Sequence, residues 1–196
     1  MIKLHNYFHN IYLKILDYLS RKNSWKFLGF LSFIESIFFP IPPDLMLVPM
    51  ILADRKKTMF LVKITTIFSV IGGIFGYFIG LYLWDVLSPH IFNLLPSFNE
   101  YFREFKIKFN EIGWLIIILG GFTPFPFKVI TISCGIMQVN LLLFVLFSFL
   151  SRGLRFALIG FLMFKFGSSI KKIIEEYLMI FTILLLSLII IYFLVN

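Results

Sequence analysis

Residues 64–84 form an uninterrupted run of 21 residues without a charged side chain, "ITTIFSVIGGIFGYFIGLYLW". A helix needs about 20 predominantly apolar residues to cross the hydrocarbon core of a bilayer. A second run of similar length extends from about residue 139 to 164, and the whole chain is 60% hydrophobic. Soluble proteins are about 45–50% apolar. The sequence therefore predicts an all-α integral membrane protein.

Two further apolar runs are too short to cross a membrane and end at prolines. Residues 27–39 are apolar for 13 positions before the first proline, and residues 112–123 precede the second proline motif. Each run resumes after its prolines, to about residues 53 and 136. These patterns predict two re-entrant hairpins, at about residues 28–53 and 112–136. Their tips contain Pro40, Pro42, Pro43, Pro124 and Pro126.

Each predicted hairpin precedes a predicted span, at about residues 58–84 and 139–164. Lys and Arg concentrate beside these elements, with five in residues 1–26, four in 54–63 and three in 165–176. The positive-inside rule explains the net charge of +8 without a nucleic-acid partner and places these segments, including the N-terminus, in the cytoplasm. The two hairpins then enter from opposite faces, which makes an inverted repeat of the kind found in secondary transporters.

Three other segments complete the predicted organisation around a membrane core at residues 27–168. Residues 1–26 have apolar side chains at helical spacing opposite basic ones, which predicts an amphipathic interfacial helix, with an ordinary packed helix as the alternative. Residues 169–196 include the apolar run from Tyr177 to Val195 and predict one more transmembrane helix. Residues 85–111 are predicted to be a polar loop in which Pro89 and Pro96 break any long helix.

Five ionisable residues lie inside apolar stretches, where a charge costs a few kcal/mol and marks a pathway or a paired site. Two interpretations are compatible with them. The acids neutralise the bases and hold the repeats together, or the bases receive an anionic headgroup while a carboxylate takes up and releases protons. These residues are Glu35, Asp44, Lys128, Arg152 and Arg155.

Alignment of the two Pro-x-Pro motifs supplies a more specific hypothesis. Asp44 and Lys128 each lie two residues after the second proline of their motif. In an inverted repeat these positions are equivalent. The alignment therefore predicts a direct ion pair between Asp44 and Lys128 across the pseudo-two-fold axis.

Small residues recur along both predicted spans. Gly72, Gly76 and Gly80 are four residues apart on one face, and Gly153 and Gly160 occupy the second span. Such stripes allow a neighbouring helix to approach closely. They are predicted to serve helix packing, and the same stripe is compatible with a homo-oligomer or with a partner protein.

Motifs for catalysis and metal binding are missing from the sequence. The three histidines lie outside the predicted spans without an HExxH pattern, and Cys134 is the only cysteine. The serines lack a GxSxG context. We therefore expect neither an enzyme, nor a metal site, nor a cofactor.

Four stretches resemble the DedA family, also called the VTT or SNARE-associated domain family, and especially its YqaA-like branch. They are "ESIFFPIPPDLMLVP", "SVIGGIFGYFIG", "GGFTPFPFKVITISCG" and "SRGLRF", within residues 28–167. The resemblance implies a multi-pass protein of the bacterial inner membrane that moves a phospholipid or polyprenyl phosphate between leaflets, with protons as the coupling ion. It also implies that Glu35 and Asp44 are the essential acids.

The chain departs from the family pattern at two places. Many DedA proteins carry arginines where this sequence has Gly121 and Phe127. A phosphate receptor would therefore have to use Lys128, Arg152 and Arg155 instead. A membrane assembly or scaffold protein without a transported substrate is the alternative function.

Overall fold

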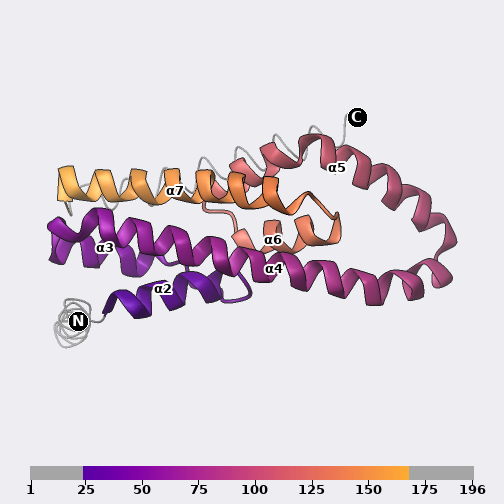
Figure 1. Ribbon diagram of the computed structural model, residues 1–196, viewed down its shortest axis with the longest axis horizontal. Helices are drawn as coiled ribbons and strands as arrows, with labels where there is room; N and C mark the ends of the chain where they lie inside the picture. Colours follow the sequence, from indigo (N-terminus) through magenta and orange to yellow (C-terminus); the bar gives the residue numbers. More distant parts are fainter. Residues whose placement is uncertain (1–23, 168–196) are drawn as a thin grey trace, which may run out of the picture.

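The structure is a computed structural model that describes residues 24–167, and all regular elements of this part are helices (Figure 1). This confirms the predicted all-helical class for the described residues. The predicted interfacial helix lies outside them except for its last three positions, and the predicted helix at 169–196 lies outside entirely. The elements are α2 (Ser24–Glu35), α3 (Asp44–Ala53), the 3-10 turn η1 (Arg55–Lys57), α4 (Thr58–Leu94), α5 (Pro96–Phe122), α6 (Phe127–Ile136) and α7 (Leu141–Phe166).

Two helices are long and apolar enough to cross a membrane. One comprises η1 and α4, Arg55–Leu94, and the other is α7, Leu141–Phe166. They contain the first predicted span and all but the first two residues of the second. The short apolar helices α3 and α6 have ten residues each, which corresponds to a rise of about 15 Å. Each short helix therefore covers about half of a hydrocarbon core of about 30 Å.

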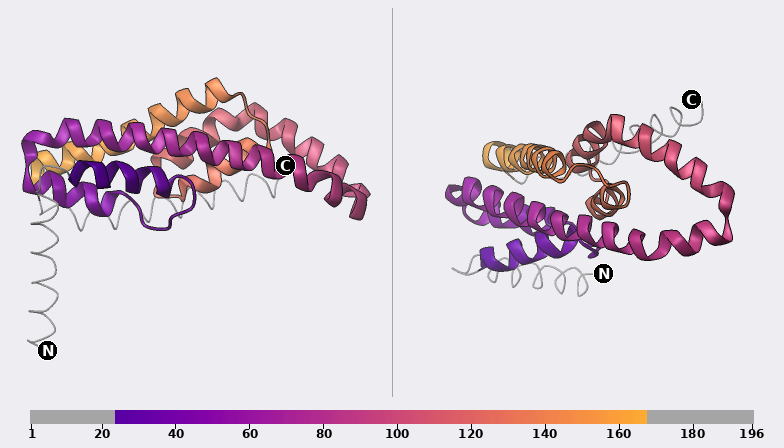
Figure 2. Two further views of the ribbon diagram at one scale, coloured as in Figure 1. Left: turned by 60° about the horizontal axis from the view of Figure 1, so that its bottom comes forward. Right: turned by 45° about the vertical axis from the view of Figure 1, so that its right-hand side comes forward.

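The short helices belong to two helical hairpins that point toward each other along the bundle. In Figures 1 and 2, α2 runs inward from one end and α3 returns to it, while α5 and α6 do the same from the other end. The two loops meet near the middle. Contacts join them there, because Thr131 Oγ1 of α6 donates to the Ser36 carbonyl after α2 over 3.2 Å. Whether these hairpins are re-entrant in a bilayer remains a prediction.

The prediction of a polar loop at residues 85–111 is wrong, because this segment is helical. Pro89 lies inside α4, and Pro96 occupies the start of α5, where its missing N–H needs no helical partner. Aromatic rings pack the two helices together beyond the hairpins, with the Trp84 and Phe102 centroids 4.2 Å apart. This packing offsets the cost of a proline inside a helix, about 3 kcal/mol. Residues 112–122 are accordingly the last part of a 27-residue helix.

The glycine stripe of α4 faces other helices of the same chain. A Cβ on Gly72 would meet the backbone of α2, and a Cβ on Gly76 or Gly80 would meet α6. On α6, Gly135 faces the Tyr77 carbonyl of α4 in the same way. The long helix α4 therefore contacts both hairpins at backbone distance, which only glycine permits at these positions.

The two glycines of α7 differ from each other. A Cβ on Gly160 would lie 2.7 Å from Val62 Cγ2 of α4, which is tighter than van der Waals contact. A Cβ on Gly153 would lie 3.6 Å from Thr66 Cγ2, an ordinary contact. Close approach therefore requires glycine at 160 and not at 153.

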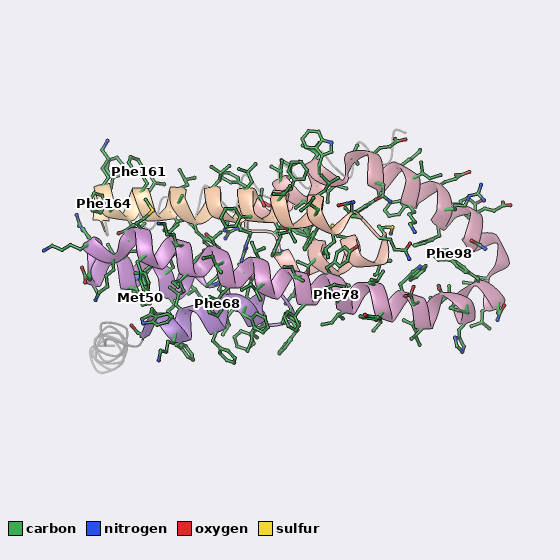
Figure 3. The ribbon with its side chains drawn as sticks, viewed as in Figure 1. Met50, Phe68, Phe78, Phe98, Phe161 and Phe164 are labelled. Atoms are coloured by element: carbon green, nitrogen blue, oxygen red, sulfur yellow. The ribbon has the colours of Figure 1, made fainter. Side chains whose placement is uncertain are left out.

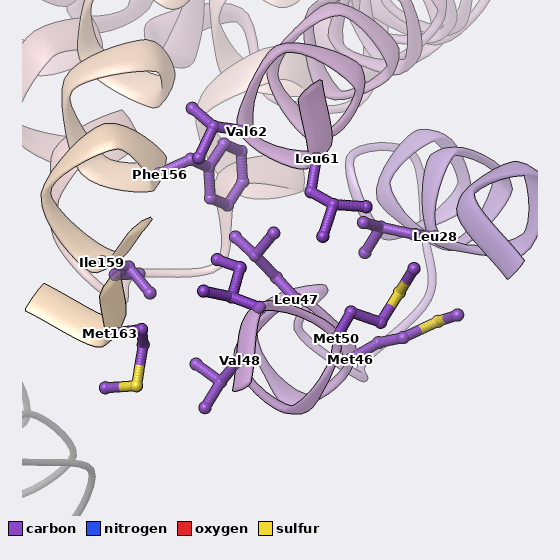
Figure 4. Packing of buried hydrophobic residues seen from close by; sticks show 11 residues of the cluster. Leu28, Met46, Leu47, Val48, Met50, Leu61, Val62, Phe156, Ile159 and Met163 are labelled. Atoms are coloured by element: carbon purple, nitrogen blue, oxygen red, sulfur yellow. The ribbon is translucent and has the colours of Figure 1, made fainter. Parts of the chain in front are cut away.

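Apolar side chains fill the space between the helices and also cover the outer surface. One cluster joins α2, α3, α4 and α7 and includes the buried Leu47, Ile51 and Phe156 (Figure 4). A second joins α4, α5, α6 and α7 around Phe127 and Phe144. Many large apolar side chains point outward instead (Figure 3), as expected of a protein surrounded by lipid.

We expect Gly80→Ala to lower the free energy of unfolding by about 1–3 kcal/mol, because the added methyl group would overlap the Ile132 carbonyl of α6. Gly153→Ala is the matched control, since the same methyl group fits there. Thermal unfolding of both purified variants measures the difference. Equal melting temperatures would contradict the proposed packing of α4 on α6.

Candidate functional site

A cavity of about 200 Å³ lies where the two hairpin loops meet. All five predicted tip prolines line it, together with Phe39 and Phe125. Four of the five predicted charged residues also line it, namely Glu35, Lys128, Arg152 and Arg155. The fifth, Asp44, contacts Arg155. The structure thus brings together all the residues that the sequence singles out for headgroup binding and proton coupling.

Arg152 of α7 forms a buried ion pair with Glu35, the last residue of α2. Arg152 Nη2 lies 2.7 Å from Glu35 Oε2, and Arg152 is only 2% exposed. Its Nε donates to Ser69 Oγ of α4 over 2.7 Å. The guanidinium carbon lies 4.7 Å from the ring centroids of both Phe127 and Phe156. One arginine therefore connects four helices, and cation–π contacts fix the plane of its guanidinium group.

Arg155 lies one turn further along α7 and joins the two hairpin loops. Its Nη2 donates to Asp44 Oδ2 at the start of α3, and its Nη1 donates to the Thr123 carbonyl at the end of α5. The spacing of three residues puts both arginines on one face of α7. The Asp44–Arg155 contact thus ties the first hairpin to the helix that also binds the second.

Two buried polar atoms of this second pair have no hydrogen-bond partner within the described structure. They are Asp44 Oδ1 and Arg155 Nε. An unsatisfied buried polar atom costs about 1–3 kcal/mol unless water or a ligand reaches it. The pair therefore retains one unused donor and one unused acceptor.

The predicted direct pair between Asp44 and Lys128 is wrong. Asp44 pairs with Arg155, and Lys128 Nζ donates to the Phe38 carbonyl in the first loop over 3.1 Å. The physical reason lies in α7, which the alignment of the two loops leaves out. The Arg155 side chain of α7 binds the Asp44 carboxylate. Lys128, at the beginning of α6, donates to the Phe38 carbonyl instead.

The charges at the cavity do not cancel. Three cations and two carboxylates leave a formal net charge of +1, and each carboxylate is already paired with an arginine. Among residues 24–167, no carboxylate lies within ion-pair distance of Lys128. The site is therefore suited to receive an anion. In the same part of the chain no group of three or more His, Cys, Asp or Glu side chains could hold a metal ion.

The hydroxyl groups around this site were missed by sequence reasoning. Ser36 and Ser69 form a buried hydrogen bond of 2.9 Å between their Oγ atoms, and Ser69 also accepts from Arg152. A sequence feature could have identified Ser69, because it lies three residues before Gly72 on the face of α4 that contacts α2. Ser36 directly follows the buried acid Glu35. Both hydroxyl groups help to position Arg152.

The structure also explains the departures at Gly121 and Phe127. A Cβ on Gly121 would meet the Ser151 side chain, and the Phe127 ring lies under the Arg152 guanidinium. A long side chain at residue 121 would therefore displace α7 at the position of its arginines. In this chain α7 supplies two of the three positive charges at the cavity, and α5 and α6 supply the surface against which it packs.

The chain is similar to known proteins along most of its length. The VTT domain family matches residues 39–165, which include most of the first loop, the whole second loop, α4 and most of α7. An uncharacterised protein of Haemophilus influenzae is 37% identical over 174 residues, which are 86% of this chain and 88% of that protein. The "Uncharacterized protein HI0703 homolog" of Histophilus somni is 31% identical over 172 residues, 86% of this chain and 89% of its own length. No solved structure matches the chain. The matched family and the two apolar spanning helices lead to one conclusion: the chain belongs to the VTT domain, or DedA, family of membrane proteins.

Proposed function

We propose that the protein moves a lipid with a phosphate-bearing headgroup, a phospholipid or a lipid-linked phosphate, between the leaflets of the bacterial inner membrane. The observation that carries this proposal is the cavity with a net charge of +1 between two oppositely directed hairpins. Phosphate is an anion that arginine and lysine bind well. The chain acts as a transporter or scramblase and not as an enzyme.

The dimensions of the elements support a position of this cavity near the middle of the bilayer. With α4 and α7 as spans, hairpin arms of ten residues reach about halfway across. Irregular backbone is tolerated at that depth only where protein buries it or where it lines a hydrated cavity. The two proline loops fit this condition, because they contact each other and line the cavity. In this proposal both hairpins are re-entrant.

The basic residues support an orientation. Arg55, Lys56 and Lys57 of η1 lie at the same end of the bundle as Lys165 of α7. By the positive-inside rule this end is cytoplasmic, and so is the N-terminus. The first hairpin then opens to the cytoplasm and the second to the opposite side.

The ion pairs suggest how transport is coupled to protons. A phosphate group that approaches Lys128 also competes with Asp44 for Arg155. Arg155 is the side chain that joins the two loops, because it donates to both Asp44 and the Thr123 carbonyl. Uptake of a proton by Asp44 or Glu35 removes the negative charge that held the arginine. Binding of the headgroup, protonation of the carboxylate and separation of the loops therefore favour one another.

The rival function, a scaffold that binds partners through its glycine stripe, has less support. Gly72, Gly76 and Gly80 contact α2 and α6 of the same chain. These residues consequently do not form an exposed surface to which another protein's helix could bind. A transporter needs no such surface.

We expect Glu35→Gln and Asp44→Asn each to reduce lipid translocation at least tenfold, because each removes a carboxylate that can carry a proton and release an arginine. The assay follows labelled phospholipid and labelled polyprenyl phosphate in liposomes at two pH gradients. Membrane abundance and melting temperature of each variant serve as controls. Unchanged translocation in a well-folded variant would remove that residue from the mechanism.

Charge reversal tests the observed pairing. Asp44→Arg and Arg155→Asp should each abolish translocation and destabilise the fold, and the double variant should recover with a coupling free energy of about 1–3 kcal/mol. Asp44→Lys with Lys128→Asp is the comparison and should show no recovery, since these side chains are not paired. Recovery only in the comparison variant would show that the Arg155 pairing is incorrect.

A further inference from the structure

We propose that the end of the bundle around η1 is a binding surface for acidic phospholipid headgroups. This inference requires only that α4 and α7 cross a membrane, and it does not depend on what the cavity transports. Four helix ends meet here, since α2 and α4 begin and α3 and α7 end at this side (Figure 1). Side chains from elements distant in sequence therefore share one surface.

This surface is strongly cationic. Of the described residues it carries six exposed Lys or Arg side chains and a single acid, Asp54, whose Oδ2 is paired with Lys57 Nζ at 3.0 Å. Among the described residues, the six cations of this surface therefore face one carboxylate. The six are Lys26, Arg55, Lys56, Lys57, Lys63 and Lys165.

Specific contacts hold these cations in one place. Arg55 Nη1 donates to the Phe164 carbonyl over 3.2 Å, which joins η1 to the last turn of α7 beside Lys165. The rings of Trp25 and Phe60 pack edge to face, with centroids 5.7 Å apart, which joins the start of α2 to the start of α4. The surface is therefore a fixed part of the fold.

Aromatic rings lie beside the cations of this surface, as is common for residues at the membrane–water interface. Lys165 Nζ lies 5.8 Å and 5.4 Å from the ring centroids of Phe161 and Phe166, both exposed. Lys26 Nζ lies 5.8 Å from the Trp25 ring. Exposed rings at this level contact the upper acyl chains, while the ammonium groups reach the phosphates.

The opposite end of the bundle lacks this pattern. Residues 85–111 carry three Lys or Arg and four Asp or Glu, which leaves a formal net charge of −1. The asymmetry points to a leaflet rich in acidic lipid at the η1 end alone.

The test is native mass spectrometry of the full chain in detergent, titrated with phosphatidylglycerol or with phosphatidylcholine. A Lys or Arg near an anionic membrane surface contributes about fivefold to the affinity. We therefore expect Lys56→Gln combined with Lys165→Gln to weaken phosphatidylglycerol binding about 25-fold and to leave phosphatidylcholine binding unchanged. Within residues 24–167 neither side chain donates a hydrogen bond that the fold would lose. Lys63→Gln alone, with an expected fivefold loss, is the second variant.

Arg103→Gln combined with Lys108→Gln is the matched control, because it removes the same charge from the opposite end. We expect it to change phosphatidylglycerol binding less than twofold. Equal losses in the two double variants, or no loss in either, would overturn the proposal. Complete competition by inorganic phosphate would also overturn it, since the surface would then bind the free ion and not the lipid.

Discussion

The guanidinium groups of Arg152 and Arg155 set the position of every element around the cavity. Each is buried in a protein that lipid surrounds, and each is matched by a carboxylate of the first hairpin, at the end of α2 or the start of α3. Removal of one partner of a buried ion pair typically costs about 3–5 kcal/mol, because the other charge remains without compensation. The two pairs thus fix the first hairpin against α7. The Thr123 carbonyl fixes the second hairpin to the same helix.

Two kinds of contact hold the helices together. Along α4, glycines bring α2 and α6 to backbone distance, which leaves little freedom for these helices to move relative to it. At the loops, ion pairs and single hydrogen bonds hold the hairpins together, and prolines withhold backbone donors. Charged ligands can compete for such polar contacts but not for packed glycines. The proposed opening of the site at its loops, with the helices keeping their packing, is consistent with this difference between the contacts.

Much of this arrangement follows from the sequence. Run lengths and prolines locate both hairpin loops and both spans, and the cost of charge in an apolar run identifies the five charged residues of the site. The pairing of Asp44 did not follow, because it depends on the rotation of α7, which brings Arg155 to the loops. The helical conformation of residues 85–111 did not follow either. Pro89 argues against a helix, and the packing of Trp84 against Phe102 outweighs it only in the folded chain.

In the proposed arrangement the two hairpins enter the membrane from opposite faces and meet at the cavity. Side-specific labelling with a membrane-impermeant thiol reagent tests it most directly, in a background in which Cys134, the only cysteine, is replaced by serine. Single cysteines would replace Lys56, in the turn after α3, and Gln138, in the turn after α6. We expect Lys56→Cys to react from the cytoplasmic side and Gln138→Cys from the opposite side. Labelling of both from the same side would contradict the inverted arrangement.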